Sequence, residues 1–436
     1  MKKDVIVFVN AIRPATFGAL AAYEEKTGRA FTPIVLVDRK IQESITERNG
    51  QKHHGKSLIV IDADFDSPKS LMGAIRPYQD RIYAITCQYE NSMLELKKLV
   101  PYFPYLPMPS ERSLDWSTEK KLMREMLEIY DPALVPRYTE VFDTSKETIT
   151  RLEKELTYPM VVKPSGLEGS LLVSMVNDRE ELIETLKNTF RHVQEAYDVW
   201  IKRQVPRLLV EEFMDGDVYS IDTYVGADGT CYPTPPVKTL TGRRVGFDDF
   251  FGYMQSVPCG LTENEIKEAS VTATKACHAI GLRSVTAHVE LMKLPTGWKV
   301  IELGSRIGGY RHDLYMRGYG INHIMNDILN RANEVPQIPT AVENYTAAFN
   351  IYAHDEGILE SVEGVEGVQQ LRSFVSLRQI FHKGQEVLFA KHNGDRIFEI
   401  ILSHPDKDQF ERDVQYMQDN LIIKVKRSKS VTSHSV

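Results

Sequence analysis

The sequence predicts a mixed α/β and α+β fold, in which a parallel-sheet domain is followed by a two-part unit and a strand-rich C-terminal portion. Three observations support this prediction. Short β-branched runs alternate with helical stretches over the first hundred residues, four prolines interrupt the chain between 101 and 109, and glycine turns separate the later strands. The length of 436 residues also suggests two to four domains.

The first hundred residues read as strands separated by helices. Val5–Val9 is a continuous apolar run, residues 15–26 have helical periodicity, and further short runs occupy 34–37, 58–61 and 81–87. Such buried strands predict a parallel sheet that is covered on both faces. The loop 10–14 follows the first strand, where ligands bind in open α/β sheets. It holds no GxGxxG sequence, so we predict no dinucleotide site there.

After the prolines, we predict a helix over 117–130 with Ser117 as its N-cap. Further helices are expected at 144–156, 178–196 and 263–280, and a strand-rich segment begins at Tyr345. The net charge is −7, without a basic domain, so nucleic acid is not an expected partner. No stretch approaches the roughly 20 apolar residues needed to cross a bilayer, so a membrane is not expected either. The four cysteines have no CxxC spacing, which predicts free thiols and a cytoplasmic protein. A homodimer is compatible with all of these features.

A pair of carboxylates gives the strongest functional signal. Residues 286–293 and 298–304 both alternate like strands around a turn. A hairpin centred on Thr296 would place Glu290 directly opposite Glu302, with Cβ atoms about 5 Å apart. Two like charges at this separation repel unless a cation lies between them, and Mg²⁺ with phosphate oxygens suits hard carboxylate ligands. The alternative is a hairpin face that carries ordinary solvated charges.

The same register places a cation beside this pair. The period of two puts Glu302, Gly304 and Arg306 on one face, before the double glycine at 308–309. An arginine next to a metal site suits negative charge that develops on an acyl or phosphoryl oxygen. The sequence therefore predicts a phosphate-handling site on this hairpin.

Two weaker patterns precede the hairpin. A strand over 158–164 ends at Lys163 and Pro164, and the loop after it contains glycines and serines whose backbone N–H groups can cradle phosphate. The stretch 208–216 then joins two strands, and its backbone edge can pair with an adenine ring while an acid accepts from the amino group. Each pattern alone also fits a plain turn or hairpin.

Taken in order, these motifs resemble the ATP-grasp superfamily, and most of all its carboxylate–amine ligases, the group around L-amino-acid ligases and D-alanine–D-alanine ligase. The resemblance runs from the N-terminal domain to about residue 335. It implies a Rossmann-like N-terminal domain over 1–110, a central ATP-grasp subdomain over 111–225 and a C-terminal ATP-grasp subdomain over 226–335. The strand-rich portion would then occupy 336–436.

The resemblance also implies roles for residues that match the family motifs. Lys120 matches a lysine that meets phosphate, and Lys163 matches the lysine on the α-phosphate and adenine side. The mobile phosphate loop would contain Gly166, Gly169 and Ser170, and the adenine site would contain Glu211 near the amino group and the hinge of Glu212, Phe213 and Met214. The magnesium ligands would be Glu290 and Glu302, with Arg306 at the acyl-phosphate step and His288 as a basic contact to the triphosphate.

The chain departs from the family pattern at two ligand positions. Gly304 stands where relatives carry a third metal-binding residue, usually asparagine, so water or substrate would fill that position. Val218 stands where the ribose-binding acid is expected, and Asp217 is its candidate replacement. We also expect Lys238 or Arg243 to reach phosphate or a substrate carboxylate, although the loop after 243 reads equally as a structured surface loop.

These features predict an ATP- and Mg²⁺-dependent (or Mn²⁺-dependent) ligase that activates a small carboxylate, an amino acid or a related acid, for attack by an amine. Two alternatives remain open at this point. One is an ATP-grasp carboxylase-like enzyme that activates bicarbonate, although no segment for carrier recognition is visible. The other is a degenerate nucleotide-binding module without turnover, which Gly304 and Val218 favour.

Overall fold

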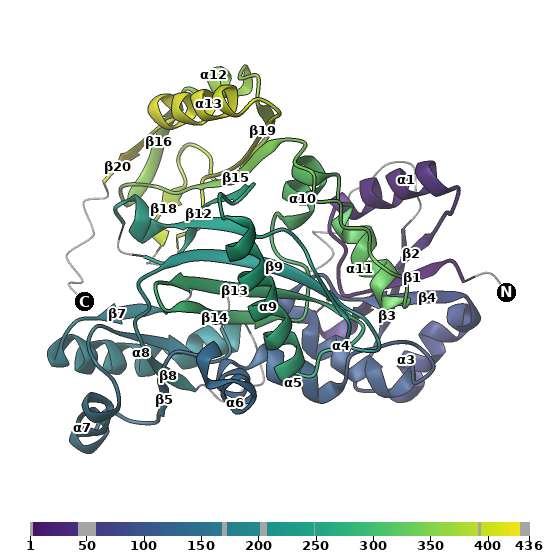
Figure 1. The fold of residues 1–436 in the computed structure, drawn as a ribbon, viewed down its shortest axis with the longest axis horizontal. Helices are drawn as coiled ribbons and strands as arrows, with labels where there is room; N and C mark the ends of the chain where they lie inside the picture. The colour runs from purple at the N-terminus through teal and green to yellow at the C-terminus, as the bar shows by residue number, and fades with distance from the viewer. Residues whose placement is uncertain are drawn as a thin grey trace.

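The computed structural model describes residues 3–41, 58–167, 172–200, 207–247, 249–390 and 394–427. The fold is mixed α/β, as predicted (Figure 1).

The N-terminal domain is built on a parallel four-stranded sheet in the order β3-β2-β1-β4. Apolar side chains of α3, α4 and α5 pack on one face of this sheet, and α1 packs on the other face. The second face is also covered by α11, from much later in the chain, which lies beside α1 in Figure 1. The elements are β1 (Val5–Val9), α1 (Ala15–Thr27), β2 (Thr32–Asp38), β3 (Ile59–Ala63), α3 (Pro68–Ile75), β4 (Ile82–Thr86), α4 (Met93–Leu99), α5 (Glu111–Thr118) and α11 (His323–Arg331).

The helix predicted over 117–130 is in fact two helices. The chain is extended at Glu119, so α5 ends at Thr118 and α6 (Lys120–Tyr130) begins directly afterwards. Ser117 is therefore not an N-cap, and its hydroxyl donates to the carbonyl of Leu114 within α5. The break matters because it places Lys120 in the first turn of a new helix.

A separate antiparallel sheet in the order β5-β8-β6-β7 follows, and α7 and α8 pack against it. Its elements are β5 (Tyr138–Val141), α7 (Lys146–Glu155), β6 (Met160–Pro164), β7 (Ser174–Val176), α8 (Arg179–Trp200) and β8 (Leu208–Glu212). Both helices begin within two residues of the predicted positions. Figure 1 shows this unit below and to the side of the large central sheet.

Nine of the remaining strands form one large sheet with the path β14-β13-β9-β11-β12-β15-β19-β17, and β10 pairs with β9. The helix α9 packs its buried alanines on one face, against β9, β13 and β14. The elements are β9 (Asp217–Val225), β10 (Cys231–Pro233), β11 (Val237–Thr241), β12 (Gly252–Val257), α9 (Glu263–Ala279), β13 (Val285–Leu294), β14 (Gly297–Gly304), α10 (Arg311–Tyr319), β15 (Tyr345–Ile351), β17 (Phe374–Gln379) and β19 (Phe398–His404).

This sheet differs from the expected segment boundaries in two respects. β9 lies within the expected 111–225 segment, yet it pairs with β13 in the large sheet rather than with β8. The expected 336–436 portion also contributes β15, β17 and β19 to the same sheet. The rest of that portion forms a small sheet with α12 (Val365–Gln369) and α13 (Lys407–Asn420), and its strands are β16 (Gly357–Glu363), β18 (Glu386–Val387) and β20 (Ile422–Lys426).

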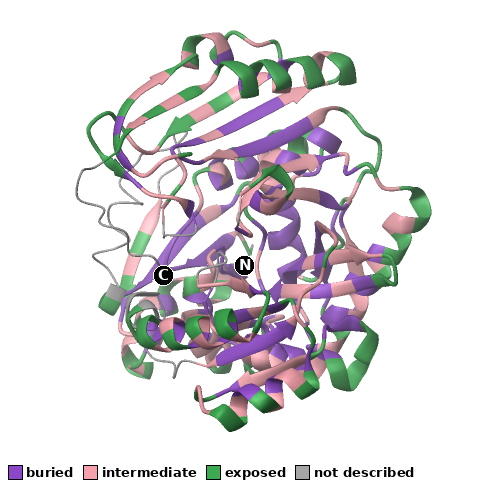
Figure 2. Cartoon of the chain, turned by 90° about the vertical axis from the view of Figure 1, so that its left-hand side faces the viewer, coloured by how far each residue is buried: buried purple, intermediate pink, exposed green. Residues whose placement is uncertain are grey.

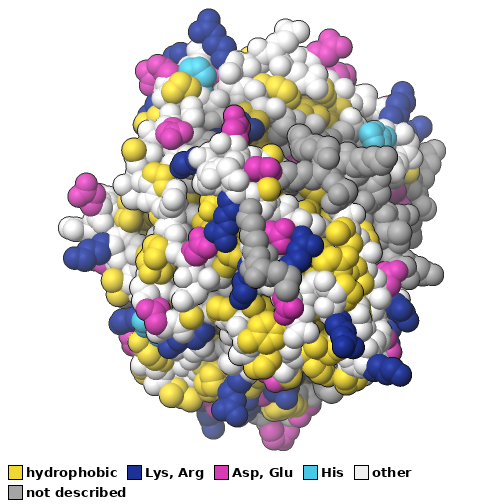
Figure 3. All heavy atoms as spheres, turned by 90° about the vertical axis from the view of Figure 1, so that its right-hand side faces the viewer, with side chains coloured by type: hydrophobic (Ala, Val, Ile, Leu, Met, Phe, Trp, Pro, Cys, Tyr) yellow, Lys and Arg dark blue, Asp and Glu magenta, His cyan; other side chains and the backbone are white. Residues whose placement is uncertain are grey.

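Buried residues follow the strands of the large sheet, whereas exposed residues gather on the outer helices (Figure 2). On the face drawn in Figure 3, basic and acidic side chains are interspersed with hydrophobic ones. Among the described residues, no helix has the length and apolar character needed to cross a membrane.

Candidate active site

The two opposed carboxylates lie on the hairpin of β13 and β14. Leu294 pairs with Gly297, so the turn lies half a residue before the predicted centre, and a regular ladder would place Ile301 opposite Glu290. A β-bulge at this point shifts the register by one residue, so that Glu290 pairs directly with Glu302. The predicted pairing is therefore confirmed, but it depends on the bulge.

Lys120 reaches this pair from the start of α6. Its Nζ lies 3.1 Å from Oε1 of Glu302 and donates to the carbonyl of Leu167 at 2.5 Å. Its backbone N–H donates to the carbonyl of Ser165 at 2.9 Å. The lysine thus connects the start of the glycine-containing loop to the carboxylate pair, and its charge offsets part of their repulsion.

A second cluster surrounds Glu211 at the end of β8. Oε2 of this carboxylate lies 2.7 Å from Nζ of Lys163, and Oε1 accepts from Nε of Arg124 at 2.8 Å. Burial alone would raise the pKa of Glu211, but Arg124 and Lys163 hold it at about 2. Burial, together with the nearby Arg124, lowers the pKa of Lys163 to about 8. The family-based role of Lys163 at the α-phosphate stays a prediction.

Arg124 links this cluster to the hairpin. Its side chain is fully buried, and its Nη2 donates to the carbonyl of Ile301, the bulge residue, at 2.7 Å. The same nitrogen lies 3.2 Å from Oε2 of Glu211. The guanidinium of Arg124 therefore binds both Glu211, the acid predicted near adenine, and the backbone of the bulge at Ile301.

The predicted hinge follows β8. The N–H of Glu212 donates to the carbonyl of Arg137 at 2.9 Å, and that arginine also lies 3.0 Å from the Glu212 carboxylate. The N–H of Phe213 donates to the carbonyl of Pro159 at 3.2 Å. Among the described residues, no hydrogen bond engages the N–H of Met214, so this group remains as the donor that an adenine nitrogen would need.

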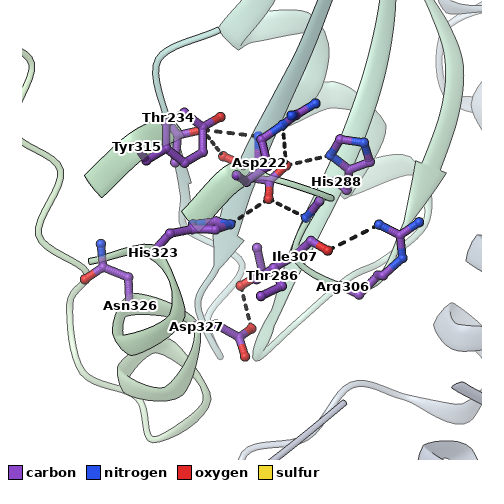
Figure 4. Close-up of polar contacts among 12 residues, drawn as sticks. Asp222, Thr234, Thr286, His288, Arg306, Ile307, Tyr315, His323, Asn326 and Asp327 are labelled. Carbon is purple, nitrogen blue, oxygen red and sulfur yellow. Dashed lines mark hydrogen bonds and ion pairs between the residues drawn. The ribbon is translucent and has the colours of Figure 1, made fainter. Parts of the chain in front are cut away.

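Asp222 on β9 is the centre of a buried polar network (Figure 4). Its Oδ1 accepts from Nδ1 of His288 at 2.6 Å, and its Oδ2 accepts from Nε2 of His323 at 2.7 Å and from the N–H of Gly308 at 2.8 Å. Burial alone would raise the pKa of Asp222, but the two imidazoles hold it well below its usual range. A Cβ at Gly308 would come within 2.6 Å of Nδ1 of His288, so this approach requires glycine.

The network orients His288 toward the carboxylate pair. Nε2 of His288 lies 3.3 Å from Oε1 of Glu290. Burial alone would lower the pKa of His288, but Asp222 raises it above its usual value. For Glu290 burial alone would raise the pKa, but the hydrogen bond with His288 lowers it, so Glu290 stays ionised. Both ring nitrogens of His288 contact carboxylates, so this imidazole positions Glu290, and its predicted contact with the triphosphate stays a prediction.

The segment after β14 meets the N-terminal domain. Nε of Arg306 lies 2.7 Å from Oε2 of Glu90, and its Nη1 donates to the carbonyl of Ile307 at 3.2 Å (Figure 4). Arg13, in the loop after β1, donates to the carbonyls of Gly308 at 2.9 Å and Ile307 at 3.2 Å. The loop after β1, which sequence analysis placed at the ligand-binding edge, contacts the neighbours of the predicted catalytic arginine, and the loop after β4 contacts the arginine itself.

Two predicted contacts lie on the wrong face of the sheet. Directly paired residues share a face, and Glu290 pairs with Ser220. Lys238 pairs instead with Tyr219, whose side chain packs in the core beneath α9. Asp217 lies two residues before Tyr219 on β9, so its side chain points to that same face. The predictions that Lys238 reaches phosphate and that Asp217 binds ribose are therefore wrong, because strand alternation turns both side chains away.

The predicted phosphate loop is described only in part. The N–H of Gly166 donates to the hydroxyl of Tyr197 on α8 at 2.7 Å. Gly169 and Ser170 lie outside the described residues. The described chain resumes at Leu172, whose φ of 56° lies in the left-handed region.

Two further arginines border the site. Nη2 of Arg311 donates to Oγ of Ser220 at 2.6 Å and Nη1 to Oε1 of Gln255 at 2.5 Å, so this buried side chain lies on the carboxylate face. The guanidinium of Arg243 lies 5.2 Å from the ring centroid of Phe213, which places it at the hinge. Such a stack is a cation–π contact.

The donor set fits a magnesium–phosphate site. Among the described residues, no group of three or more His, Cys, Asp and Glu side chains is placed to enclose a metal ion. Mg²⁺ is usually held by one or two carboxylates, with water and substrate phosphate completing the shell. Glu290 and Glu302 would supply the carboxylates when the metal is bound, and ATP would supply phosphate oxygens.

Sequence reasoning missed Arg124, Asp222 and Glu90. A signal for Arg124 and Asp222 was present in the sequence, because each is a charged residue at a position of its helix or strand that faces the core. A buried charge of this kind needs partners. Glu90 gives no such signal, because its contact with Arg306 joins positions more than 200 residues apart.

We expect the predicted contact of Lys163 with phosphate to make ATP binding depend on pH. Its pKa of about 8 leaves roughly half of the lysine neutral at pH 8, and bound phosphate would favour the charged form. We expect binding of ATP at pH 8 to take up as much as about half a proton, and calorimetry in buffers of different ionisation enthalpy measures this uptake. Lys163→Arg stays charged and should remove it. Equal enthalpies in all buffers for the unaltered protein would contradict the assignment.

Comparison with known proteins agrees with this geometry. Residues 156–313 match the family described as ATP-grasp domain. Over 166 residues the chain is 27% identical to the D-alanine–D-alanine ligase of Ruminiclostridium cellulolyticum, an alignment that covers 35% of this chain and 39% of the ligase. The chain thus spans well under half of the length of this curated relative.

Solved structures match over nearly the whole chain. The L-amino acid ligase from Bacillus licheniformis has a TM-score of 0.76 at 20% identity and covers 98% of this chain and 100% of its own. The biotin carboxylase from Campylobacter jejuni has a TM-score of 0.62 at 13% identity and covers 96% and 92%. At these identities the likeness concerns the fold.

Proposed function

We propose that this chain is an ATP- and magnesium-dependent ligase that activates a small carboxylate as an acyl phosphate for attack by an amine, and the match of residues 156–313 to the ATP-grasp domain supports this proposal. The observation that carries this proposal is the opposed pair of Glu290 and Glu302, with Lys120 and Arg306 beside it. A hairpin that served only to pack would gain nothing from two facing carboxylates, which destabilise the pair unless a cation joins them.

The proposed reaction has two steps. A substrate carboxylate oxygen attacks the γ-phosphorus of ATP, ADP leaves, and an acyl phosphate forms. The nitrogen of an amine then attacks the acyl carbon, inorganic phosphate leaves, and the amine loses a proton. When bound, Mg²⁺ would neutralise charge on the phosphate oxygens.

The side chains of this protein would act by positioning and charge. The Met214 N–H and Glu211 would bind the adenine side, and Lys120 would hold the loop over the phosphates against the hairpin. Arg306 would offset the negative charge on the acyl-phosphate oxygens. Asp222 and His288 would fix the orientation of Glu290.

A screen tests the proposal. Pairs of carboxylates and amines are incubated with ATP and Mg²⁺, phosphate release is measured, and products are identified by mass spectrometry. We expect release that depends on the acid, with an amide product that carries the amine. Release with bicarbonate alone would instead indicate carboxylase-like chemistry. ATP binding without release for any acid would indicate a nucleotide-binding module.

A further inference from the structure

Two of the four cysteines meet where α9 packs on β9 and β10. Cys231 on β10 pairs directly with Val225 of β9, so its side chain points to the same face of the sheet as Val225. Val225 packs in the core beneath α9, and Cys277 on the buried side of α9 belongs to that same core cluster. The two thiols lie within hydrogen-bond distance, and the thiol of Cys277 donates to the sulfur of Cys231.

The four cysteines, all of which the structure describes, differ in their access to solvent. Cys87, Cys259 and Cys277 are buried, whereas Cys231 is partly exposed. Burial raises the pKa of Cys87 to about 12, and it also raises the pKa of Cys259. Both of these thiols stay protonated at neutral pH, and a protonated, inaccessible thiol is inert toward oxidants.

The surroundings of Cys231 instead favour its thiolate. The hydrogen bond from Cys277 lowers the pKa of Cys231 against the effect of burial, and the positive charge of Arg283 acts in the same direction. The guanidinium of Arg283 packs against Gly229, where an added Cβ would lie 2.6 Å from Cζ of the arginine. Nε2 of His278 lies 3.0 Å from the carbonyl oxygen of Gly229 and 3.6 Å from Sγ of Cys231. Cys231 therefore combines solvent access, a cation nearby and a second thiol in contact.

From this geometry we propose that Cys231 and Cys277 are a peroxide-reactive pair that closes to an intramolecular disulfide. The thiolate of Cys231 attacks one oxygen of hydrogen peroxide, the O–O bond breaks, and the hydroxide that leaves takes up a proton to form water. The sulfur of Cys277 then attacks the sulfenic sulfur of Cys231, the S–O bond breaks, and the hydroxyl leaves with the thiol proton as a second water. The two thiols lose two electrons, and one peroxide gains them.

The first step prepares the second. The hydrogen bond with Cys231 is the largest cause that raises the pKa of Cys277, followed by burial. Oxidation of Cys231 removes the thiolate that accepts this hydrogen bond, so Cys277 loses its proton more easily at the step in which it attacks. A low-pKa, accessible thiol beside a second cysteine is the usual arrangement of a reversible thiol oxidation site.

This inference does not depend on the proposed ligase function. The two thiols lie on the face of the sheet that α9 covers, whereas Glu290 lies on the opposite face. The disulfide would join α9 to β10 and close the segment between 231 and 277 into a loop. A cross-link of this kind stabilises the folded state, mainly by restricting the unfolded chain.

The test follows the thiols of the protein during oxidation. Reduced protein is treated with one molar equivalent of hydrogen peroxide, denatured in iodoacetamide, digested and analysed by mass spectrometry. We expect peptides joined through Cys231 and Cys277, with Cys87 and Cys259 fully alkylated. Dithiothreitol should restore both lost thiols, and the thermal midpoint of the oxidised protein should exceed that of the reduced protein by about 2–4 °C.

Three variants separate the roles of the thiols. Cys277→Ala leaves the accessible thiol without its partner, so dimedone should trap a sulfenic acid at Cys231 and no intramolecular disulfide should form. Cys231→Ala leaves buried thiols only, so the rate of thiol loss should fall at least about 10-fold. Cys259→Ala removes a buried thiol elsewhere in the core and should leave the yield of the disulfide unchanged.

Several results would overturn the proposal. They are sulfinic acid at Cys231 of the unaltered protein without a disulfide, a disulfide that joins two molecules, and oxidation of Cys87 or Cys259 at the rate of Cys231. Full alkylation of all four cysteines after peroxide treatment would overturn it as well.

Discussion

Glu302→Ala is expected to lower ATP-dependent phosphate release by at least about 1000-fold, which corresponds to roughly 4 kcal/mol of transition-state stabilisation. Glu302 pairs directly with Glu290, and it also receives Lys120 at 3.1 Å. Its removal would leave Mg²⁺ with one carboxylate and Lys120 without its partner on the hairpin. The measurement is the steady-state rate of phosphate release with an acid found active in the screen.

The control for this variant is Glu268→Ala, which removes an exposed carboxylate from α9 and should release phosphate at the unaltered rate. Glu302→Gln keeps the size of the side chain and should be nearly as inactive as Glu302→Ala, because the amide lacks the charge that Mg²⁺ requires. Circular dichroism checks that each variant is folded. A Glu302→Ala protein within tenfold of the unaltered rate would remove the basis of the metal assignment.

The opposed carboxylates could be predicted from the sequence because strand alternation is local. A turn at 295–297 and two alternating segments predict that Glu290 and Glu302 come together, although the direct pairing in the structure also needs the bulge at Ile301. The same alternation explains why the predictions for Asp217 and Lys238 failed. Both side chains point to the face of the sheet opposite the one that carries Glu290. Alternation along one strand is local, but relating Lys238 to Glu290 also needs the register between β11, β9 and β13, which is not local.

The contacts that complete the site could not be predicted, because they join distant segments. The bulge at Ile301 is held by Arg124 from α6, and Arg306 is held by Glu90 from the N-terminal domain. Nothing in the local pattern around 301 signals an extra residue. Membership of β9 in the large sheet is equally non-local, since its partners β11 and β13 follow it in the chain.

Asp222→Asn is expected to destabilise the large sheet by about 3–5 kcal/mol, the usual cost of removing one partner of a buried ionic network. Asp222 accepts from His288, His323 and the Gly308 N–H. The asparagine keeps one acceptor oxygen, and its NH₂ group would face a donor. The thermal midpoint should fall by roughly 3–5 °C, whereas Asp408→Asn, at an exposed position on α13, should leave it unchanged.

The pH dependence of this loss follows from the two pKa shifts. The lowered pKa of Asp222 makes its contribution available above the unfolded value of about 3.9, and the contribution is lost as the pH falls through the folded value. The raised pKa of His288 makes its contribution complete below about 6.5, and it is lost as the pH rises through the folded value. The stability difference between Asp222→Asn and the unaltered protein should therefore be larger at pH 5.5 than at pH 9. A difference that grows with pH would show that the imidazole of His288 is not charged beside Asp222, and the orientation of Glu290 would then depend on a neutral hydrogen bond.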